Sequence, residues 1–155
     1  MSSYLGRDYS AAFNATNTQS TTLPLCALLS ATTIRPKIYD VLIGSSGSPA
    51  DNAAEYLFQR QTTAGTSTAF TGVALDPADP ASLAAFGYTF TSAGPTLTSN
   101  AYVLEIGMNQ RQFVRWIAAP GGELVSPATA NNGIAILAAA VSATWTAQVT
   151  VHWAE

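Results

Sequence analysis

The sequence predicts an all-β fold, an antiparallel β-sandwich or jelly roll of about eight strands. Short apolar or alternating segments recur roughly every 8–14 residues, with Gly, Pro and Asn between them. The last segment, residues 144–153, alternates strictly between apolar and polar side chains, a period of two that excludes a helix there. At 155 residues the chain has the size of one domain.

The first half of the chain contains loosely patterned segments bounded by turn residues. Each expected strand stops at a run rich in Gly, Ser, Pro or Asp, such as residues 44–49 and 76–80. One helical turn is expected over residues 80–86, because a proline occupies its first position. We expect strands over residues 22–29, 34–43, 53–62, 69–75 and 88–91.

The second half is patterned more clearly. Residues 102–108 and 112–118 are separated by a three-residue link, and this spacing predicts a hairpin. Residues 134–141 are nearly all apolar, as expected for a strand that is buried on both faces. A brief strand is expected over residues 123–125, and the last strand over residues 144–153.

Residues 1–20 are polar and weakly patterned, and we expect a flexible N-terminal arm before a single domain over residues 21–155. Tyr4, Tyr9 and Phe13 are scattered through this arm. The segment could be a frayed terminus. It could equally become ordered on a neighbouring subunit, with the three aromatic side chains as anchors.

Charge is scarce in this chain. Only 10% of the residues are charged and the net charge is -3, whereas about 25% are charged in an average soluble domain. A nearly neutral surface suits a subunit that covers much of itself with neighbours, because burying charge is costly. The acidic balance argues against nucleic acid as a partner. The longest apolar run has eight residues, far short of the roughly 20 of a membrane-spanning helix, and the first residues lack the apolar segment of a secretory signal.

The residues that could perform catalysis form no recognisable pattern. Asp40, Glu55 and Glu105 lie in expected strands and could supply a glycosidase pair, but their spacing selects no pair. His152 is the single histidine, and no serine lies in a G-x-S-x-G elbow. Cys26 has apolar neighbours that suppress thiol reactivity. We therefore expect a protein that is not an enzyme and that has no cofactor or metal.

Five of the six basic residues are arginine, the type favoured in interfacial ion pairs. Arg111 and Arg115 flank the expected hairpin, and one interpretation pairs them with Glu105 inside the chain. The other interpretation is a contact between subunits, because Trp, Tyr and Arg dominate interface energetics. Some of these residues must belong to the core, since Phe113 and Trp116 fall on opposite faces of one strand. The predicted interface residues are Tyr4, Tyr9, Phe13, Arg111, Phe113, Arg115 and Trp116.

Two runs of the sequence, PKIYDVLIGSSGSPADNAAEYLFQR and EIGMNQRQFVRWIAAPGGELVSPATANNGIAI, resemble small structural proteins of tailed bacteriophages. The similarity is to the capsid decoration (cement) group, several members of which are jelly rolls. It covers residues 33–155 and rests on no catalytic signature. It implies a virion protein, made in the host cytoplasm, that binds the outer surface of the major capsid protein shell as a homo-trimer or dimer.

Other functions stay open at this point. The protein could be a phage tail or fibre-attachment protein, a carbohydrate-binding module with exposed tryptophans, or a small hydrolase that uses strand carboxylates. Coplanar exposed aromatic rings on a sheet face would favour the sugar module, and a cleft with paired carboxylates would favour the hydrolase. A large apolar, self-complementary face would favour capsid decoration.

Overall fold

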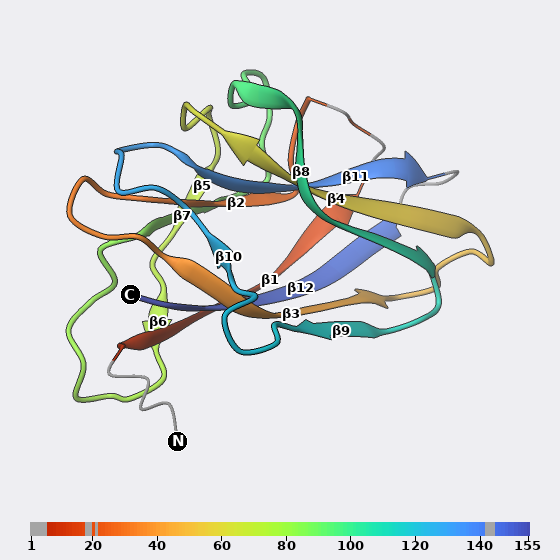
Figure 1. The fold of residues 1–155 in the computed structure, drawn as a ribbon. Helices are drawn as coiled ribbons and strands as arrows, with labels where there is room; N and C mark the ends of the chain where they lie inside the picture. Colours follow the sequence, from red (N-terminus) through yellow and green to blue (C-terminus); the bar gives the residue numbers. More distant parts are fainter. Residues whose placement is uncertain (1–5, 18–19, 21, 142–144) are drawn as a thin grey trace.

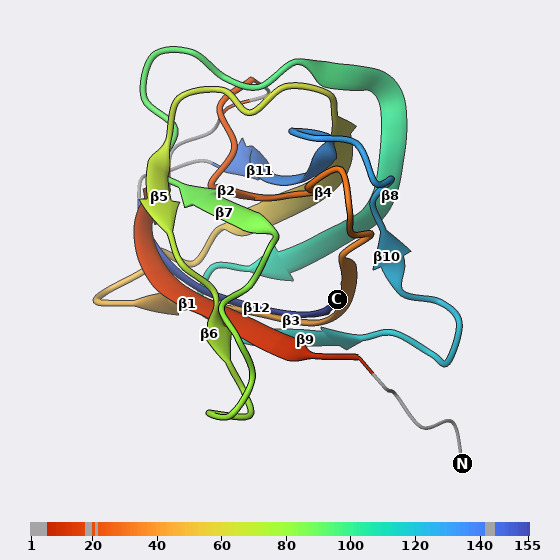
Figure 2. The same cartoon turned by 90° about the vertical axis from the view of Figure 1, so that its left-hand side faces the viewer.

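The computed structural model describes residues 6–17, 20, 22–141 and 145–155. This part of the chain is all-β and forms two six-stranded antiparallel sheets, whose facing sides enclose one large hydrophobic cluster (Figures 1 and 2). The all-β, two-sheet part of the expectation is confirmed. The described residues contain twelve strands and not about eight, because several short strands are added at the sheet edges.

Sheet A contains the first and the last strand of the chain. Its order is β10 (Leu124–Val125), β3 (Lys37–Ser46), β12 (Trp145–Ala154), β1 (Asp8–Asn17) and β6 (Val73–Ala74), and β9 (Val114–Ile117) also pairs with β3.

Sheet B covers the other side of the core. Its order is β5 (Thr68–Phe70), β7 (Ala85–Tyr88), β2 (Cys26–Leu29), β11 (Gly133–Val141), β4 (Ala53–Gln61) and β8 (Leu97–Asn109).

The pairing is nested from the ends of the chain inward. The first strand, β1, pairs with the last, β12, and β2 pairs with β11. β3 pairs with β9 and β10, and β4 pairs with β8. Strands β1 to β4 alternate between the two sheets, so each connection crosses the end of the sandwich.

Alternation of side chains builds the core, as predicted for the last strand. In β12, Trp145, Ala147, Val149, Val151 and Trp153 are all buried, and the residues between them are partly or fully exposed. Residues 134–139 of β11 are buried without interruption, which confirms the strand expected to be buried on both faces.

The arm expected over residues 1–20 is wrong for residues 8–17, which form β1 between β12 and β6. Tyr9 is fully buried and stacks on Trp153 at a ring distance of 5.9 Å. Phe13 faces the interior as well and contacts the ring of Tyr88. Residues 9–16 alternate like a strand, but small side chains at half of the positions conceal the pattern. Tyr4 lies outside the described residues.

Three other expectations are wrong in their local structure. The helical turn over residues 80–86 is replaced by a coil that leads into β7. The expected strand over residues 69–75 divides into β5 and β6, which belong to different sheets. The expected hairpin over residues 102–118 does not form, because β8 belongs to sheet B and β9 to sheet A. The turn between β8 and β9 carries the chain across the end of the sandwich, where the Gln110 amide donates to the Asn52 carbonyl.

Candidate functional site

The outer face of sheet A is a solvent-facing surface whose side chains the strand register places in rows. Asn14 of β1 lies opposite Gln148 of β12, and Ser10 lies opposite His152. Thr150 of β12 lies opposite Leu42 of β3, which in turn lies opposite Arg115 of β9. This face therefore brings together residues that are more than 100 positions apart in the sequence.

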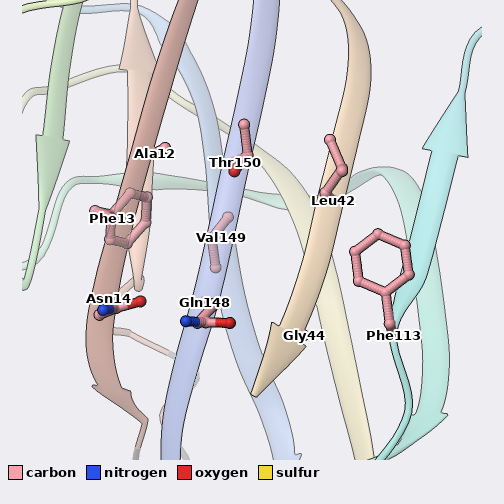
Figure 3. Close-up of a pocket in the computed structure, with 9 residues that line it drawn as sticks. All are labelled: Ala12, Phe13, Asn14, Leu42, Gly44, Phe113, Gln148, Val149 and Thr150. Carbon is pink, nitrogen blue, oxygen red and sulfur yellow. The ribbon is translucent and has the colours of Figure 1, made fainter. Parts of the chain in front are cut away.

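A shallow groove of about 380 Å³ crosses this face (Figure 3). The ring of Phe113 forms one side of it, and the carboxamides of Asn14 and Gln148 lie next to each other at its lower end (Figure 3). Gly44 lies beside the Phe113 ring, and a Cβ at this glycine would lie 3.4 Å from the ring, at the limit of ordinary contact. None of the lining side chains is charged, and they are Ala12, Phe13, Asn14, Leu42, Gly44, Phe113, Gln148, Val149 and Thr150.

A charged cluster lies beside the groove and is neutralised within the chain. The buried carboxylate of Asp40 accepts two hydrogen bonds from Arg115, at 3.0 Å from Nε and 2.7 Å from Nη2. His152 places Nδ1 3.1 Å from the same carboxylate. The hydrogen bonds from Arg115 lower the pKa of Asp40, against the effect of its burial, and the contact with His152 lowers it further. The cluster pairs the charge of Asp40 with that of Arg115, next to a groove that has no charged lining.

Beyond the cluster lies a second hollow of about 310 Å³, bordered by Asp8, Tyr39, Ile117, Ala118 and Pro120. The Tyr39 ring stacks on the His152 imidazole at 6.1 Å. Burial, followed by the charges of Asp8 and Asp40, raises the pKa of Tyr39 to about 12. Its hydroxyl therefore stays protonated and neutral at physiological pH.

The predicted interface residues separate into two groups. Phe113 is 63% exposed and lines the groove, Arg115 lies on the same face, and Arg111 is exposed in the turn before β9. Trp116 and Phe13 pack against the core, as expected for at least some members of the set. Tyr9 is also a core residue and not an anchor on a neighbour.

Arg115 pairs with Asp40, so the expected pairing with Glu105 is wrong. Sequence reasoning also missed the polar floor of the groove, Asn14 and Gln148, which only the pairing of β1 with β12 brings together. The alternation in the last strand signals Gln148 as an outward residue, but nothing in the sequence signals its partner.

Ser10, His152 and Asp40 follow one another as the nucleophile, base and acid of a hydrolytic triad would, but they do not make all the hydrogen bonds of a triad. The register places the three residues in one row across β1, β12 and β3. Among the described residues no hydrogen bond joins the Ser10 hydroxyl to the imidazole, although His152 contacts Asp40. The row lies within a continuous sheet whose backbone amides are used in strand pairing, so no pair of amides is free to stabilise an oxyanion. The geometry orients the imidazole and does not activate the serine.

Glu55 and Glu105 form the carboxylate pair that the sequence left unselected. They lie on neighbouring strands of sheet B, beside an open hollow of about 520 Å³. A hydrogen bond from one carboxyl to the other raises the pKa of Glu55, and slight burial and the charge of Glu105 add to the effect. A glycosidase needs two carboxyl groups on either side of the scissile bond, whereas these two contact each other.

The remaining candidates for chemistry are structural. Cys26 is fully buried, and burial raises the pKa of its thiol, which confirms the expected inert cysteine. Trp145 and Trp153 are buried and Trp116 packs against the core, so the tryptophans form no exposed sugar platform.

Within the described ranges, no group of three or more His, Cys, Asp or Glu side chains could hold a metal ion. The same part of the chain contains no helix that is long and apolar enough to cross a membrane.

No family model, no curated protein and no solved structure matches this chain.

Proposed function

We propose that this chain is a non-enzymatic structural protein of a tailed bacteriophage virion. In this proposal it decorates and stabilises the capsid by binding the outer surface of the major capsid protein shell and neighbouring copies of itself, as a homo-trimer or dimer. The similarity of residues 33–155 to phage decoration proteins supports this function, and so does the scarcity of charge.

We infer that the two sheets form a jelly roll. Four nested antiparallel pairs support this: β1 with β12, β2 with β11, β3 with β9 and β4 with β8. In this interpretation these are the eight principal strands, and β5, β6, β7 and β10 are short additions at the edges. A closed two-sheet body is a rigid base for a contact that must resist the pressure of packaged DNA.

The proposal rests mainly on one observation: the groove on the outer face of sheet A has no charged lining. The buried carboxylate next to it is paired with Arg115 and His152. An unpaired charge is costly to bury in an interface, whereas a charge that already has its partner costs much less. The groove and the cluster beside it can therefore dock on a protein surface without leaving an uncompensated charge.

The test is co-sedimentation with empty shells from the matching phage. We expect saturable binding at a fixed copy ratio to the major capsid protein. Gln148→Arg places a charge in the groove at an exposed position and is expected to weaken binding at least tenfold, as expected when an unpaired charge is buried. Thr98→Arg adds the same charge on exposed β8 of sheet B and is expected to leave binding unchanged.

If the wild-type protein does not bind shells, capsid decoration is refuted. Binding to purified tails in the same assay would support the tail or fibre-attachment alternative. Shell binding that Gln148→Arg leaves intact would refute the assignment of the groove face.

One observation favours a second candidate, a carbohydrate-binding module. The groove combines an exposed aromatic ring, Phe113, with Asn14, Gln148 and Thr150, whose side chains make no hydrogen bond to the rest of the described chain. An aromatic face next to free amides and a hydroxyl is suited to a neutral sugar ring. Titration with methyl hexopyranosides, followed by NMR shifts of the Asn14 and Gln148 side-chain amides, tests this candidate. Shifts that saturate and disappear in Phe113→Ala would support it, and unchanged spectra would exclude it.

A further inference from the structure

An exposed apolar segment lies between β5 and β7, away from the groove. Val73 is 61% exposed, Leu75 is 50% exposed and Leu83 is 56% exposed. Val73 belongs to the edge strand β6 and lies opposite Ser10, so it faces the same side as the groove. We call residues 71–84 the edge loop. A solvated surface loop is not expected to present three large aliphatic side chains unless another surface covers them.

The edge loop is held in one conformation by hydrogen bonds to the partly buried Glu155 and the buried Tyr9. The Glu155 carboxylate accepts hydrogen bonds from the Leu83 and Ala84 amides, both at 2.9 Å, and from the Ser82 hydroxyl. The Tyr9 hydroxyl donates to the Pro80 carbonyl at 3.0 Å. The aliphatic side chains are therefore presented on a fixed backbone, and a fixed surface loses little entropy when it binds.

The edge loop is also acidic. Asp76 is exposed and caps the loop through a 2.9 Å hydrogen bond from the Ala78 amide to its Oδ1. No basic side chain of the described residues lies within ion-pair distance of Asp76, and Asp79 has only a long contact of 3.9 Å with Arg7. The loop thus offers apolar contact area next to an unpaired negative charge.

A surface of opposite charge lies at the turn between β8 and β9, which we call the corner. Arg111 and Phe113 are both exposed there, and no carboxylate in the described part of the chain lies within ion-pair distance of Arg111. The corner is also rigid, since the Arg111 amide donates to the Asn109 side chain at 2.9 Å and the Arg111 Nε donates to the Pro49 carbonyl at 3.2 Å. It offers an aromatic contact next to an unpaired positive charge.

The loop and the corner lie at opposite ends of the molecule. β6 and β9 are on opposite sides of β1, β12 and β3 in sheet A, and the green loop and the teal corner are far apart in Figure 1. A contact between the corners of two copies would place Arg111 near Arg111, and a contact between two edge loops would place Asp76 near Asp76. Only a contact between different ends pairs opposite charges.

We propose that copies of this chain associate head to tail, with the corner of one copy docked on the edge loop of the next. Phe113 packs against Val73 and Leu75, and Arg111 pairs with Asp76 of the neighbouring copy. Such a contact can repeat around a ring, or it can form twice in an antiparallel two-fold dimer in which each corner meets the edge loop of the other copy. The inference rests on the self-association included in the proposed function.

Engineered cysteines test the contact, both free in solution and on shells, under a mild oxidant. We expect Arg111→Cys and Asp76→Cys, each alone, to form no disulfide-linked dimer. An equimolar mixture of the two is expected to form linked dimers and nothing larger. The double variant is expected to form closed, fully linked oligomers, either a doubly linked dimer or a ring. Cys26 does not interfere, because it is buried. The control is a mixture of Arg35→Cys and Asp76→Cys. Arg35 is exposed outside the corner and the edge loop, so this mixture should form no disulfide link.

Charge reversal is the second measurement. Arg111→Asp and Asp76→Arg should each weaken self-association at least tenfold, and the two together in one chain should restore it. Linked dimers from either single-cysteine variant would overturn the proposal in favour of a contact between like ends. The absence of any link between positions 76 and 111, in solution and on shells alike, would also overturn it. Binding to shells is measured in the same samples, so failure of the head-to-tail contact is distinguishable from failure of capsid decoration.

Discussion

Asp40 shows how one buried carboxylate can organise an exposed face. It is 3% exposed, yet it contacts side chains from two neighbouring strands, Arg115 of β9 and His152 of β12. These contacts fix the positions of both side chains and pair the charge of Arg115. The absence of a free charge beside the groove thus depends on a single residue.

Replacing Asp40 by Asn should destabilise the protein at neutral pH by about 1–3 kcal/mol, because charged hydrogen bonds are lost at a buried site. The pKa of Asp40 is lowered in the fold, so its contribution is fully present above the pKa of an unfolded aspartate, about 3.9. It is lost as the pH falls through the lower folded-state pKa. Urea unfolding of the wild type and Asp40→Asn should therefore converge in acid. A stability difference that does not depend on pH would contradict this account.

Glu155 has a comparable role at the edge loop, where its carboxylate accepts hydrogen bonds from two backbone amides, the Ser82 hydroxyl and the Trp153 indole. Glu155→Gln should cost about 1–3 kcal/mol, since charge-assisted bonds are lost. Hydrogen exchange should become faster at the Leu83 and Ala84 amides and stay unchanged in β11. Unchanged exchange at those two amides would show that the carboxylate does not hold the loop.

Sequence reasoning reached some of these residues and missed their partners. The exposed Phe113, the buried Cys26 and the outward side of the last strand follow from local pattern. The pairing of Arg115 with Asp40 does not, because it needs the register of β3 with β9. The role of Glu155 at the edge loop gave no local signal, since its partners in that loop are about 70 positions away.

At the scale of elements, two glycines in neighbouring parts of sheet B differ in what surrounds them. A Cβ at Gly133 would overlap the Leu28 backbone carbonyl, while a Cβ at Gly107 would meet nothing within 4 Å. β11 and β2 can therefore approach closely only where position 133 is glycine.

Gly133→Ala should destabilise the fold by about 3 kcal/mol or prevent folding, because a backbone atom must move. Gly107→Ala in β8 is the matched control and should be neutral or stabilising by about 0.5 kcal/mol, since it restricts the unfolded chain. Thermal unfolding followed by circular dichroism measures both. Equal effects of the two substitutions would mean that the close approach of β2 to β11 is not required.

The carboxyl groups of Glu55 and Glu105 make the stability of the fold depend on pH with a sign opposite to that of Asp40. The pKa of Glu55 is raised by its hydrogen bond to Glu105, so the pair stabilises the fold in acid, and this contribution is lost as the pH rises through the raised pKa. Glu105→Gln should stabilise the protein at neutral pH by about 0.5 kcal/mol, the scale of a cross-strand like-charge pair. In acid the gain should vanish. A gain in Glu105→Gln that persists in acid would contradict the assignment.

The strands with strict patterns were predictable, and the pairing between strands was not. The last strand has period two over ten residues, and residues 134–139 are continuously apolar, so both were expected correctly. The hairpin expected over residues 102–118 failed because a short link is compatible both with a hairpin and with a crossing between sheets. β1 was missed because Ala11 and Ala15 bury little apolar area and weaken the alternation.

At the scale of the whole molecule, the scarcity of charge and the two-sheet body lead to one consistent account. In the proposed arrangement, the groove face around Asn14 and Gln148 meets the shell, and the corner and the edge loop meet neighbouring copies, so each molecule can bridge several others. Many weak contacts acting together would then stabilise a shell without any one of them being strong. Composition predicted the neutral surface directly, whereas the location of the contacts required the fold.

The most direct test of this account is the disassembly temperature of empty shells from the matching phage, measured by light scattering as purified protein is added. The account predicts that this temperature rises and then stops rising at a fixed copy ratio to the major capsid protein. Gln148→Arg, which charges the groove, should give little increase, and Thr98→Arg should behave like the wild type. A disassembly temperature that stays constant up to saturating wild-type protein would contradict the central claim that this chain decorates and stabilises a capsid.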